Sequence, residues 1–90
     1  NSRKMKTDYH SQFVKQWRKL PAKQQRQLFE RLALFQKIPF DHQLRNHRLK
    51  GKYYGFRSID ITGDLRAIYR PVSSDKAFFV VVGTHSQLYK

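Results

Sequence analysis

The sequence contains no cysteine, and glycine, proline and acidic residues are scarce in it. The absence of cysteine excludes a disulfide framework and thiolate metal ligands, and it is typical of a protein from a reducing compartment. The longest apolar run extends from Ala77 to Val82, which is too short to cross a membrane. No signal-peptide pattern opens the chain, so the sequence predicts a cytoplasmic protein that does not enter a membrane.

Acidic residues are far fewer than basic residues in this chain. Nineteen Lys and Arg residues stand against six Asp and Glu residues, and the formal net charge of the chain is +13. A domain this basic is typical of proteins that bind nucleic acid. An acidic protein and an anionic lipid surface are competing partners. These partners are not exclusive, because an acidic inhibitor can mask a basic enzyme.

The length of 90 residues fits one domain over residues 1–90. A domain of this size buries roughly 60–65% of the surface of the unfolded chain. Residues 1–4 show no periodicity, and Met5 followed by Lys-Thr-Asp-Tyr is typical of a natural start. We therefore expect residues 1–4 to be an expression remnant or a disordered terminus.

The N-terminal half has the periodicity of two helices. Apolar side chains recur every three or four positions between Tyr9 and Leu20, which predicts an amphipathic helix from residue 9 or 10 to 20. Pro21 cannot continue that helix but suits the start of another, predicted over 22–37. The two form a helical hairpin, and a short strand over 6–9 could precede it.

The C-terminal half is predicted to be a β-meander. Residues 54–62, 65–70 and 77–84 are three strand candidates, with turns at 62–64 and 71–76. Residues 38–46 have no regular pattern and are expected to form a connecting loop. Such short connections predict mainly antiparallel pairing, and the helices must cover one face of the sheet. The predicted fold is therefore α+β, with a helical hairpin on a sheet of three to four strands.

The segment from His42 to Arg57 is the densest basic stretch of the chain and contains no acidic residue. Aromatic residues are interleaved with its cations. Cations neutralise phosphates and aromatic faces stack on bases, so this mixture is typical of contacts to single-stranded RNA. The alternative is a solvated charged loop over ordinary core aromatics. The candidate cations are Arg45, Arg48, Lys50, Lys52 and Arg57, and the aromatics are Tyr53, Tyr54 and Phe56.

Two carboxylates and an arginine flank the predicted turn at 62–64. Alternation along a strand would place Asp64 and Arg66 on the same side, beside the cationic stretch. In a chain with only six acidic residues, two carboxylates beside a cationic cluster mark a candidate functional site. The alternatives are structural, because an aspartate next to Gly63 is common turn chemistry and Asp60 can be the partner of an arginine.

Two histidines, His47 and His85, are candidates for proton transfer near neutral pH. His47 lies in the basic stretch, and His85 follows the apolar strand that ends near Gly83. The alternative for each is a surface or hydrogen-bonded structural role. The chain lacks zinc spacing, an HExxH pair, a Walker loop and a Gly-x-Ser-x-Gly elbow, so no metal site or other cofactor is expected.

Four segments together resemble the RelE/ParE toxin superfamily, and the branch they resemble is YafQ-like. They are His47-Arg48-Leu49-Lys50-Gly51, Gly55-Phe56-Arg57-Ser58-Ile59-Asp60-Ile61, Asp64-Leu65-Arg66-Ala67-Ile68-Tyr69 and Gly83-Thr84-His85-Ser86-Gln87-Leu88-Tyr89. The resemblance implies the toxin of a type II toxin-antitoxin system. It implies a ribosome-dependent mRNA endonuclease that cuts in the ribosomal A site. Its partners would be the ribosome, mRNA and an acidic antitoxin.

The resemblance also implies roles for individual residues. The YafQ-like pattern has a histidine before the Leu-x-Gly turn, an aspartate that opens the next strand, and a histidine and an aromatic residue at the C-terminal end. These roles fall on His47, Asp64, His85 and Tyr89. Tyr89 would stack on a base or position the message, and its structural alternative is a hydrophobic plug that anchors the tail.

The chain departs from that pattern at two positions. The pattern has a histidine where this chain has Asp60, and an arginine where it has Val81. Related RelE-type members carry an arginine just before the hydrophobic-Tyr pair. Arg66 resembles that arginine and is expected to replace the missing cation.

The implied chemistry is metal-independent attack of a ribose 2′-hydroxyl on the neighbouring phosphorus. One group must remove the hydroxyl proton, another must protonate the departing 5′-oxygen, and cations must stabilise the phosphorane. We expect Asp64 or His47 to be the base and His85 to be the acid. The expected cations are Arg66 with Lys50 or Arg57.

Two other functions compete with cleavage. A ParE-type protein with the same fold would block DNA gyrase and perform no RNA chemistry. A plain RNA-binding or ribosome-docking module would stall translation without cutting. The joint presence of His47, Asp64 and His85 favours cleavage, because neither alternative requires that set.

Overall fold

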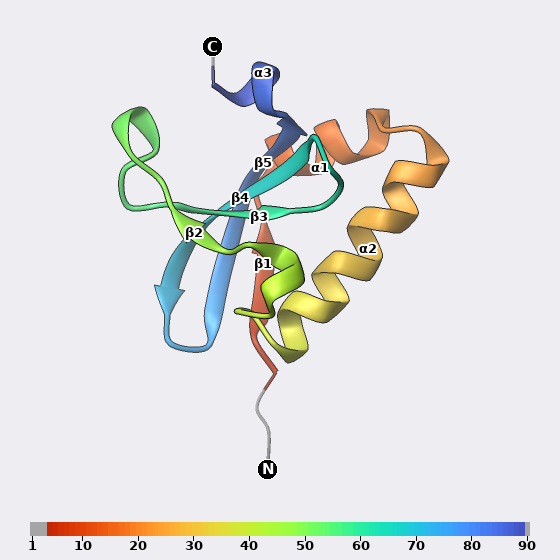
Figure 1. Cartoon of the computed structure of the whole chain (residues 1–90). Helices are drawn as coiled ribbons and strands as arrows, with labels where there is room; N and C mark the ends of the chain where they lie inside the picture. Colours follow the sequence, from red (N-terminus) through yellow and green to blue (C-terminus); the bar gives the residue numbers. More distant parts are fainter. Residues whose placement is uncertain (1–3, 90) are drawn as a thin grey trace.

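The computed structural model describes residues 4–89 and has the predicted α+β architecture (Figure 1). Two helices pack on one face of a five-stranded sheet, whose spatial order is β1-β5-β4-β3-β2. The helices are α1 (Ser11–Lys19), α2 (Ala22–Lys37) and the short α3 (His85–Leu88). The strands are β1 (Lys6–Tyr9), β2 (His47–Arg48), β3 (Arg57–Asp60), β4 (Leu65–Ser73) and β5 (Lys76–Thr84). The expectation for residues 1–4 falls, except at Lys4, outside the described residues.

The helical hairpin forms where the sequence predicted it. The ring of His10 caps α1, because its Nδ1 accepts a hydrogen bond of 3.0 Å from the backbone N–H of Gln12. Pro21 occupies the N-cap of α2, and its carbonyl accepts from Gln25 N–H at 3.0 Å. Within residues 4–89 no helix is long and apolar enough to cross a membrane.

The main core lies between the hairpin and the sheet. Phe79 of β5 is fully buried at its centre, with its ring 5.3 Å from that of Phe35 and 5.1 Å from that of Tyr69. The helices contribute Phe13, Leu28, Leu32 and Phe35, the strands contribute Ile59, Leu65, Ala67, Tyr69, Ala77, Phe79 and Val82, and Leu44 and Ile61 come from the connecting segments. The predicted covering of one sheet face by the helices is confirmed.

The sheet is mixed and has five strands, where the sequence predicted three to four. The strand at 6–9 forms and runs parallel to β5, with Lys6 opposite Lys76. The additional strand is β2, which pairs antiparallel with β3 through two residues only. A pair this short leaves no alternation for the sequence to reveal.

The strand predicted over 54–62 is shorter at both ends. Gly51 and Gly55 adopt φ of 66° and 91°, and the chain between them forms a 3₁₀ turn at Gly51–Tyr53 before β3 begins. Only glycine enters this left-handed region at little cost, so the two glycines set the shape of the loop. The expected loop over 38–46 likewise contains a 3₁₀ turn, at His42–Leu44.

Strand β4 is longer than predicted and includes Pro71, which the sequence placed in a turn. Pro71 pairs with Ala77 of β5, and the β3–β4 pairing ends at Tyr69. Beyond Tyr69 this part of β4 is therefore a sheet edge. A proline there costs no ladder hydrogen bond, because edge strands leave N–H groups unpaired.

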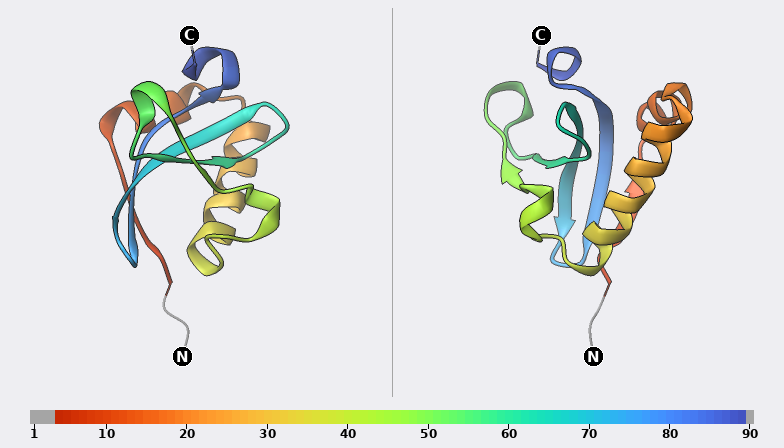
Figure 2. Two further views of the ribbon diagram at one scale, coloured as in Figure 1. Left: turned by 60° about the vertical axis from the view of Figure 1, so that its left-hand side comes forward. Right: turned by 45° about the vertical axis from the view of Figure 1, so that its right-hand side comes forward.

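The other sheet face is covered only in part, by the segment 47–56 and by α3. Figure 2 shows these two on the side opposite to α1 and α2. A second, smaller cluster of buried residues lies beneath them, formed by Leu49, Ile68, Val81 and Leu88. We call this side of the sheet the open face.

Candidate active site on the open face

The strand register places His47, Asp60 and Arg66 on the open face. His47 pairs with Ser58, Ser58 pairs with Ile68, and Asp60 pairs with Arg66. Paired residues share a face, and residues two apart on one strand share it too. Because Ile68 belongs to the cluster beneath the open face, the whole set belongs to that face.

The ring of His47 is exposed and held in one orientation. Its Nδ1 lies 2.7 Å from the backbone carbonyl oxygen of Arg45, which adopts a left-handed φ of 47°. A carbonyl oxygen can only accept, so Nδ1 carries the hydrogen of this bond. In the neutral ring the lone pair is then on Nε2, as a general base requires.

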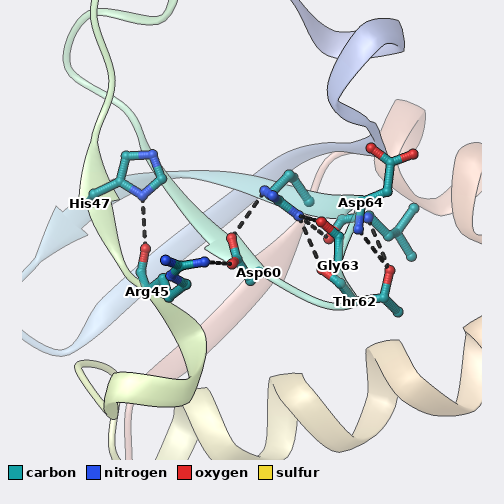
Figure 3. Close-up of polar contacts among 8 residues, drawn as sticks. Arg45, His47, Asp60, Thr62, Gly63 and Asp64 are labelled. Carbon is teal, nitrogen blue, oxygen red and sulfur yellow. Dashed lines mark hydrogen bonds and ion pairs between the residues drawn. The ribbon is translucent and has the colours of Figure 1, made fainter.

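Asp60 and Arg66 form an ion pair across β3 and β4 (Figure 3). Asp60 Oδ1 lies 3.0 Å from Arg66 Nε, and Asp60 Oδ2 lies 3.9 Å from an Arg45 nitrogen. Arg66 Nη1 also donates to the carbonyl oxygens of Thr62 and Gly63, at 3.0 and 3.1 Å. Asp60 is therefore the structural partner of an arginine. The carboxylate of Asp60 holds Nε of Arg66 and the two carbonyl oxygens hold Nη1, so two of the three guanidinium nitrogens are fixed.

Asp64 lies in the turn before β4, so strand alternation does not place it beside Arg66 as the sequence predicted. Its backbone N–H donates to Thr62 Oγ1 at 3.3 Å, and that of Leu65 donates to the same oxygen at 3.0 Å. Figure 3 shows its carboxylate pointing away from the Asp60–Arg66 ion pair. It is exposed and, within residues 4–89, forms no ion pair.

His85 begins α3 immediately after β5 and is exposed. A capping box fixes this turn: Thr84 Oγ1 accepts from Gln87 N–H at 3.3 Å, and Gln87 Oε1 accepts from Thr84 N–H at 2.8 Å. Thr84 is also the partner of Leu65 across β4 and β5. Asp64 directly precedes β4 and His85 directly follows β5, so both residues lie at the same end of the β4–β5 pair.

Tyr89 lies half-buried beside His85, with the two rings 4.6 Å apart. Its ring also meets the edge of Tyr53 at 5.8 Å and packs on the second cluster. Burial raises the pKa of the Tyr53 phenol, and the nearby Tyr89 phenol raises this pKa further. These contacts correspond to the plug expected as the structural alternative for Tyr89, and they hold the C-terminal turn against the sheet.

The cations of the basic stretch divide into two groups. Arg45, Arg48, Lys50 and Lys52 are exposed, as contacts to phosphate require. Arg57 is half-buried. It shares the row of Tyr69 and Phe79, which belong to the main core beneath the helices.

The structure therefore does not bring Arg57 to the open face, where the sequence placed it as a clamp beside Arg66. Its Nε donates to Asn46 Oδ1 at 2.7 Å, and its guanidinium lies 5.1 Å from the centre of the Phe40 ring. Asn46 also donates to the hydroxyl of Tyr69 at 2.8 Å. Burial raises the pKa of Tyr69, and the Asn46 hydrogen bond and the Arg57 charge oppose that rise.

The sequence reasoning missed the residues that orient the candidate groups. The Thr84-x-x-Gln87 spacing is a capping-box signal and was available from the sequence. The carbonyl of Arg45 that fixes His47 gives no such signal, because its role depends on a left-handed φ. Within the described part of the chain, no three His, Cys, Asp or Glu side chains gather into a group that could hold a metal ion.

Several solved structures share this fold. A conserved hypothetical protein from Helicobacter pylori is 28% identical with a TM-score of 0.70, over 94% of this chain and 99% of that one. A chain of the Escherichia coli DinJ-YafQ toxin-antitoxin complex is 22% identical with a TM-score of 0.67, over 97% and 99%. A chain of the archaeal RelE-RelB complex from Pyrococcus horikoshii is 18% identical with a TM-score of 0.72, over 93% and 98%.

These likenesses show that the two-helix, five-strand arrangement is the fold of RelE-like toxins. The model of one family, described as bacterial toxin of type II toxin-antitoxin system, YafQ, matches residues 5–90. The chain therefore belongs to the YafQ family of type II toxins, as its sequence motifs predicted. No curated protein matches the sequence.

Proposed function

We propose that this toxin is a ribosome-dependent mRNA endonuclease that inhibits translation by cutting messages in the ribosomal A site. The observation that supports this most directly is the position of Asp64 and His85. Both are exposed, and both leave the same end of the β4–β5 pair. A carboxylate and an imidazole so placed supply the two proton-transfer groups that RNA cleavage needs.

The proposed reaction needs no metal ion. Asp64 takes the proton of the ribose 2′-hydroxyl, whose oxygen attacks the adjacent phosphorus in line. The bond from phosphorus to the 5′-oxygen breaks, and the protonated ring of His85 donates its proton to that oxygen. The products are a cyclic phosphate and a 5′-hydroxyl. Arg66 stabilises the charge on the phosphorane through Nη2, since Nε and Nη1 are held inside the protein.

His47 is the other candidate base, and the sheet sets it apart from His85. It lies on β2, three strand positions from β5, which is about 14 Å at the usual strand spacing. Asp64 is the better partner for His85 on one phosphate for this reason. We assign to His47 contact with the message further along the open face, with Arg45, Lys50 and Lys52 as neighbouring phosphate contacts and Arg48 as a further contact at the β2 edge.

We also propose an acidic antitoxin as the cellular partner. Chains of the DinJ-YafQ toxin-antitoxin complex and of the RelE-RelB complex share this fold, and each complex has a second component. The charge of +13 supplies the physical reason, because an acidic disordered segment would neutralise the basic face and become ordered on it. Ribosome, mRNA and antitoxin would all meet this toxin in the cytoplasm.

The test is primer extension on a defined message in a purified translation system, with and without ribosomes. We expect discrete in-frame cuts that require ribosomes. His85→Ala should lower the cleavage rate by about 10²- to 10⁴-fold, which is the usual contribution of a general acid. His42→Ala is the matched control, because the His42 side chain is 93% exposed and lies outside the site.

Asp64→Asn and His47→Gln, measured in the same assay, identify the base. A loss as large as that of His85→Ala should follow from the first change and a smaller one from the second. Translation arrest with an intact message, equal in wild type and His85→Ala, would leave a binding module instead of an enzyme. An intact message with normal translation would direct the search to DNA gyrase.

A further inference from the structure

The three aromatic residues of the basic stretch differ in how far they are exposed. Tyr53 and Phe56 are half-buried, their rings meet at 6.2 Å, and both pack on the second cluster. Tyr54 stands out, because 84% of it is exposed. The folded loop therefore leaves one aromatic face of the three free for a ligand.

Tyr54 is exposed by an ordered loop. Its N–H donates to the carbonyl of Gly51 at 3.0 Å, and Phe56 N–H donates to the carbonyl of Tyr53 at 2.9 Å. The left-handed φ of 91° at Gly55 then turns the chain so that Phe56 faces inward. An exposed aromatic side chain on an ordered loop contributes little to the stability of the fold. Its ring is already positioned to stack on a planar ligand.

A groove of about 270 Å³ lies beside this ring. It is lined by Arg48, Leu49, Tyr54, Gly55, Phe56, Arg57 and Pro71. Its volume is below the roughly 300–1,000 Å³ of pockets that enclose a drug-sized ligand, and it suits one small planar group. Pro71, which lines the groove, lies beyond the end of the β3–β4 pairing at Tyr69.

Two arginines, Arg48 and Arg57, line the groove. Arg48 pairs with Arg57 across β2 and β3. Arg57 is held in place by Asn46, and Arg48 is exposed. Arg48 also follows His47 directly, so a strand of RNA on the open face that passes over the β2 edge reaches this groove next.

We propose that this groove is a subsite for one unpaired nucleotide of RNA, with its base stacked on Tyr54 and its phosphate held by Arg48. The subsite lies outside the reaction centre and rests on the proposed function only for the identity of the message. A planar aromatic and an exposed guanidinium group on one groove suit a nucleotide, which offers a base and a phosphate together. An acidic peptide offers charge without a stacking face.

The test is binding of a short, unstructured, fluorescently labelled RNA, followed by anisotropy without ribosomes. Tyr54→Ala should raise the Kd about 5- to 150-fold, because stacking on one aromatic contributes about 1–3 kcal/mol. Tyr54→Trp should retain binding. Phe29→Ala is the matched control, because Phe29 is 56% exposed but lies on α2, which covers the other sheet face.

Equal Kd values for Tyr54→Ala and Phe29→Ala would overturn the subsite, as would RNA binding too weak to detect in the wild type. Equal losses in Tyr54→Ala and Tyr54→Trp would overturn stacking. Competition by an acidic peptide that depends on Tyr54 as strongly as RNA does would make the groove a peptide site. The binding assay contains no ribosomes and measures no cleavage. A binding loss confined to Tyr54→Ala would therefore support the subsite even if no message were cut on ribosomes.

Discussion

Two ion pairs of nearly equal length differ in how far they are shielded from water. The Asp60–Arg66 pair spans 3.0 Å, and 15% and 19% of the two side chains are exposed. The Asp8–Lys76 pair spans 3.1 Å, and 57% and 44% of its side chains are exposed. Water screens the second pair far more than the first. Burial, rather than distance, should therefore decide what each contributes to stability.

We predict that Asp60→Asn lowers the free energy of unfolding by about 1.5–3 kcal/mol, the usual contribution of a hydrogen bond to a charged group. Asp8→Asn should lower it by about 0.2–1 kcal/mol, because its pair is exposed. Urea unfolding of both variants at low and high salt measures the difference. Equal losses, or a loss in Asp60→Asn that disappears in salt, would show that Asp60 does not hold Arg66 in a shielded site.

The same residues show how far a sequence can predict a site. The motifs that contain His47, Asp64, Arg66 and His85 are recognisable in the sequence, and the roles of these residues stay a prediction. The directions in which their side chains point could not be predicted. Asp64 belongs to a turn held by Thr62, so the alternation rule for strands does not reach it.

At the scale of elements, the position of His85 depends on how closely α3 folds back on β5. Gly83 is buried at this junction, and a Cβ built there would lie 2.9 Å from Gln87 Oε1 and 3.3 Å from Leu88 Cδ2. Gln87 is part of the capping box that shapes α3. The lack of a side chain at Gly83 therefore permits the turn that presents His85.

We predict that Gly83→Ala displaces α3 and lowers the free energy of unfolding by about 1–3 kcal/mol, as overpacking commonly does. Cleavage should fall with it, because His85 moves with α3. Gly63→Ala is the control, because nothing lies within 4 Å of a Cβ there and the φ is not left-handed. Thermal unfolding and the cleavage assay measure both effects. A Gly83→Ala variant as stable and active as Gly63→Ala would exclude this role for α3.

The helices and strands differ in how well they can be predicted from the sequence. Both long helices were predictable, because burial of one face imposes a period on their side chains, and the strand near 77–84 was predictable from its short, β-branched apolar run. Strand β2 and the part of β4 at Pro71 were not, because their pairing depends on neighbours distant in sequence. The edge formed where β3 ends is a property of the assembled sheet.

At the scale of the whole molecule, the net charge does not by itself say where RNA binds. Exposed cations occur on both sides of the sheet. Arg48, Lys50 and Lys52 lie in the segment that covers the open face, and Lys15, Arg18 and Lys19 lie on α1, across the sheet from it. The long-range electrostatic field of the protein would attract RNA to either group of cations. Direct contacts to phosphates, in contrast, depend on which of the two groups the RNA touches.

We predict that replacing Arg48, Lys50 and Lys52 together by glutamine weakens RNA binding and reduces its dependence on salt. Each contact to a single strand contributes about 0.7 to the slope of log Kd against log salt concentration, so three lost contacts should lower the slope by about 2. The same replacement of Lys15, Arg18 and Lys19 removes equal charge and should leave the slope nearly unchanged. Titrations of a labelled single-stranded RNA at several salt concentrations measure both. Equal slopes in the two triple variants would mean that the protein attracts RNA only through its net charge, because location would then have no effect on the number of phosphates contacted.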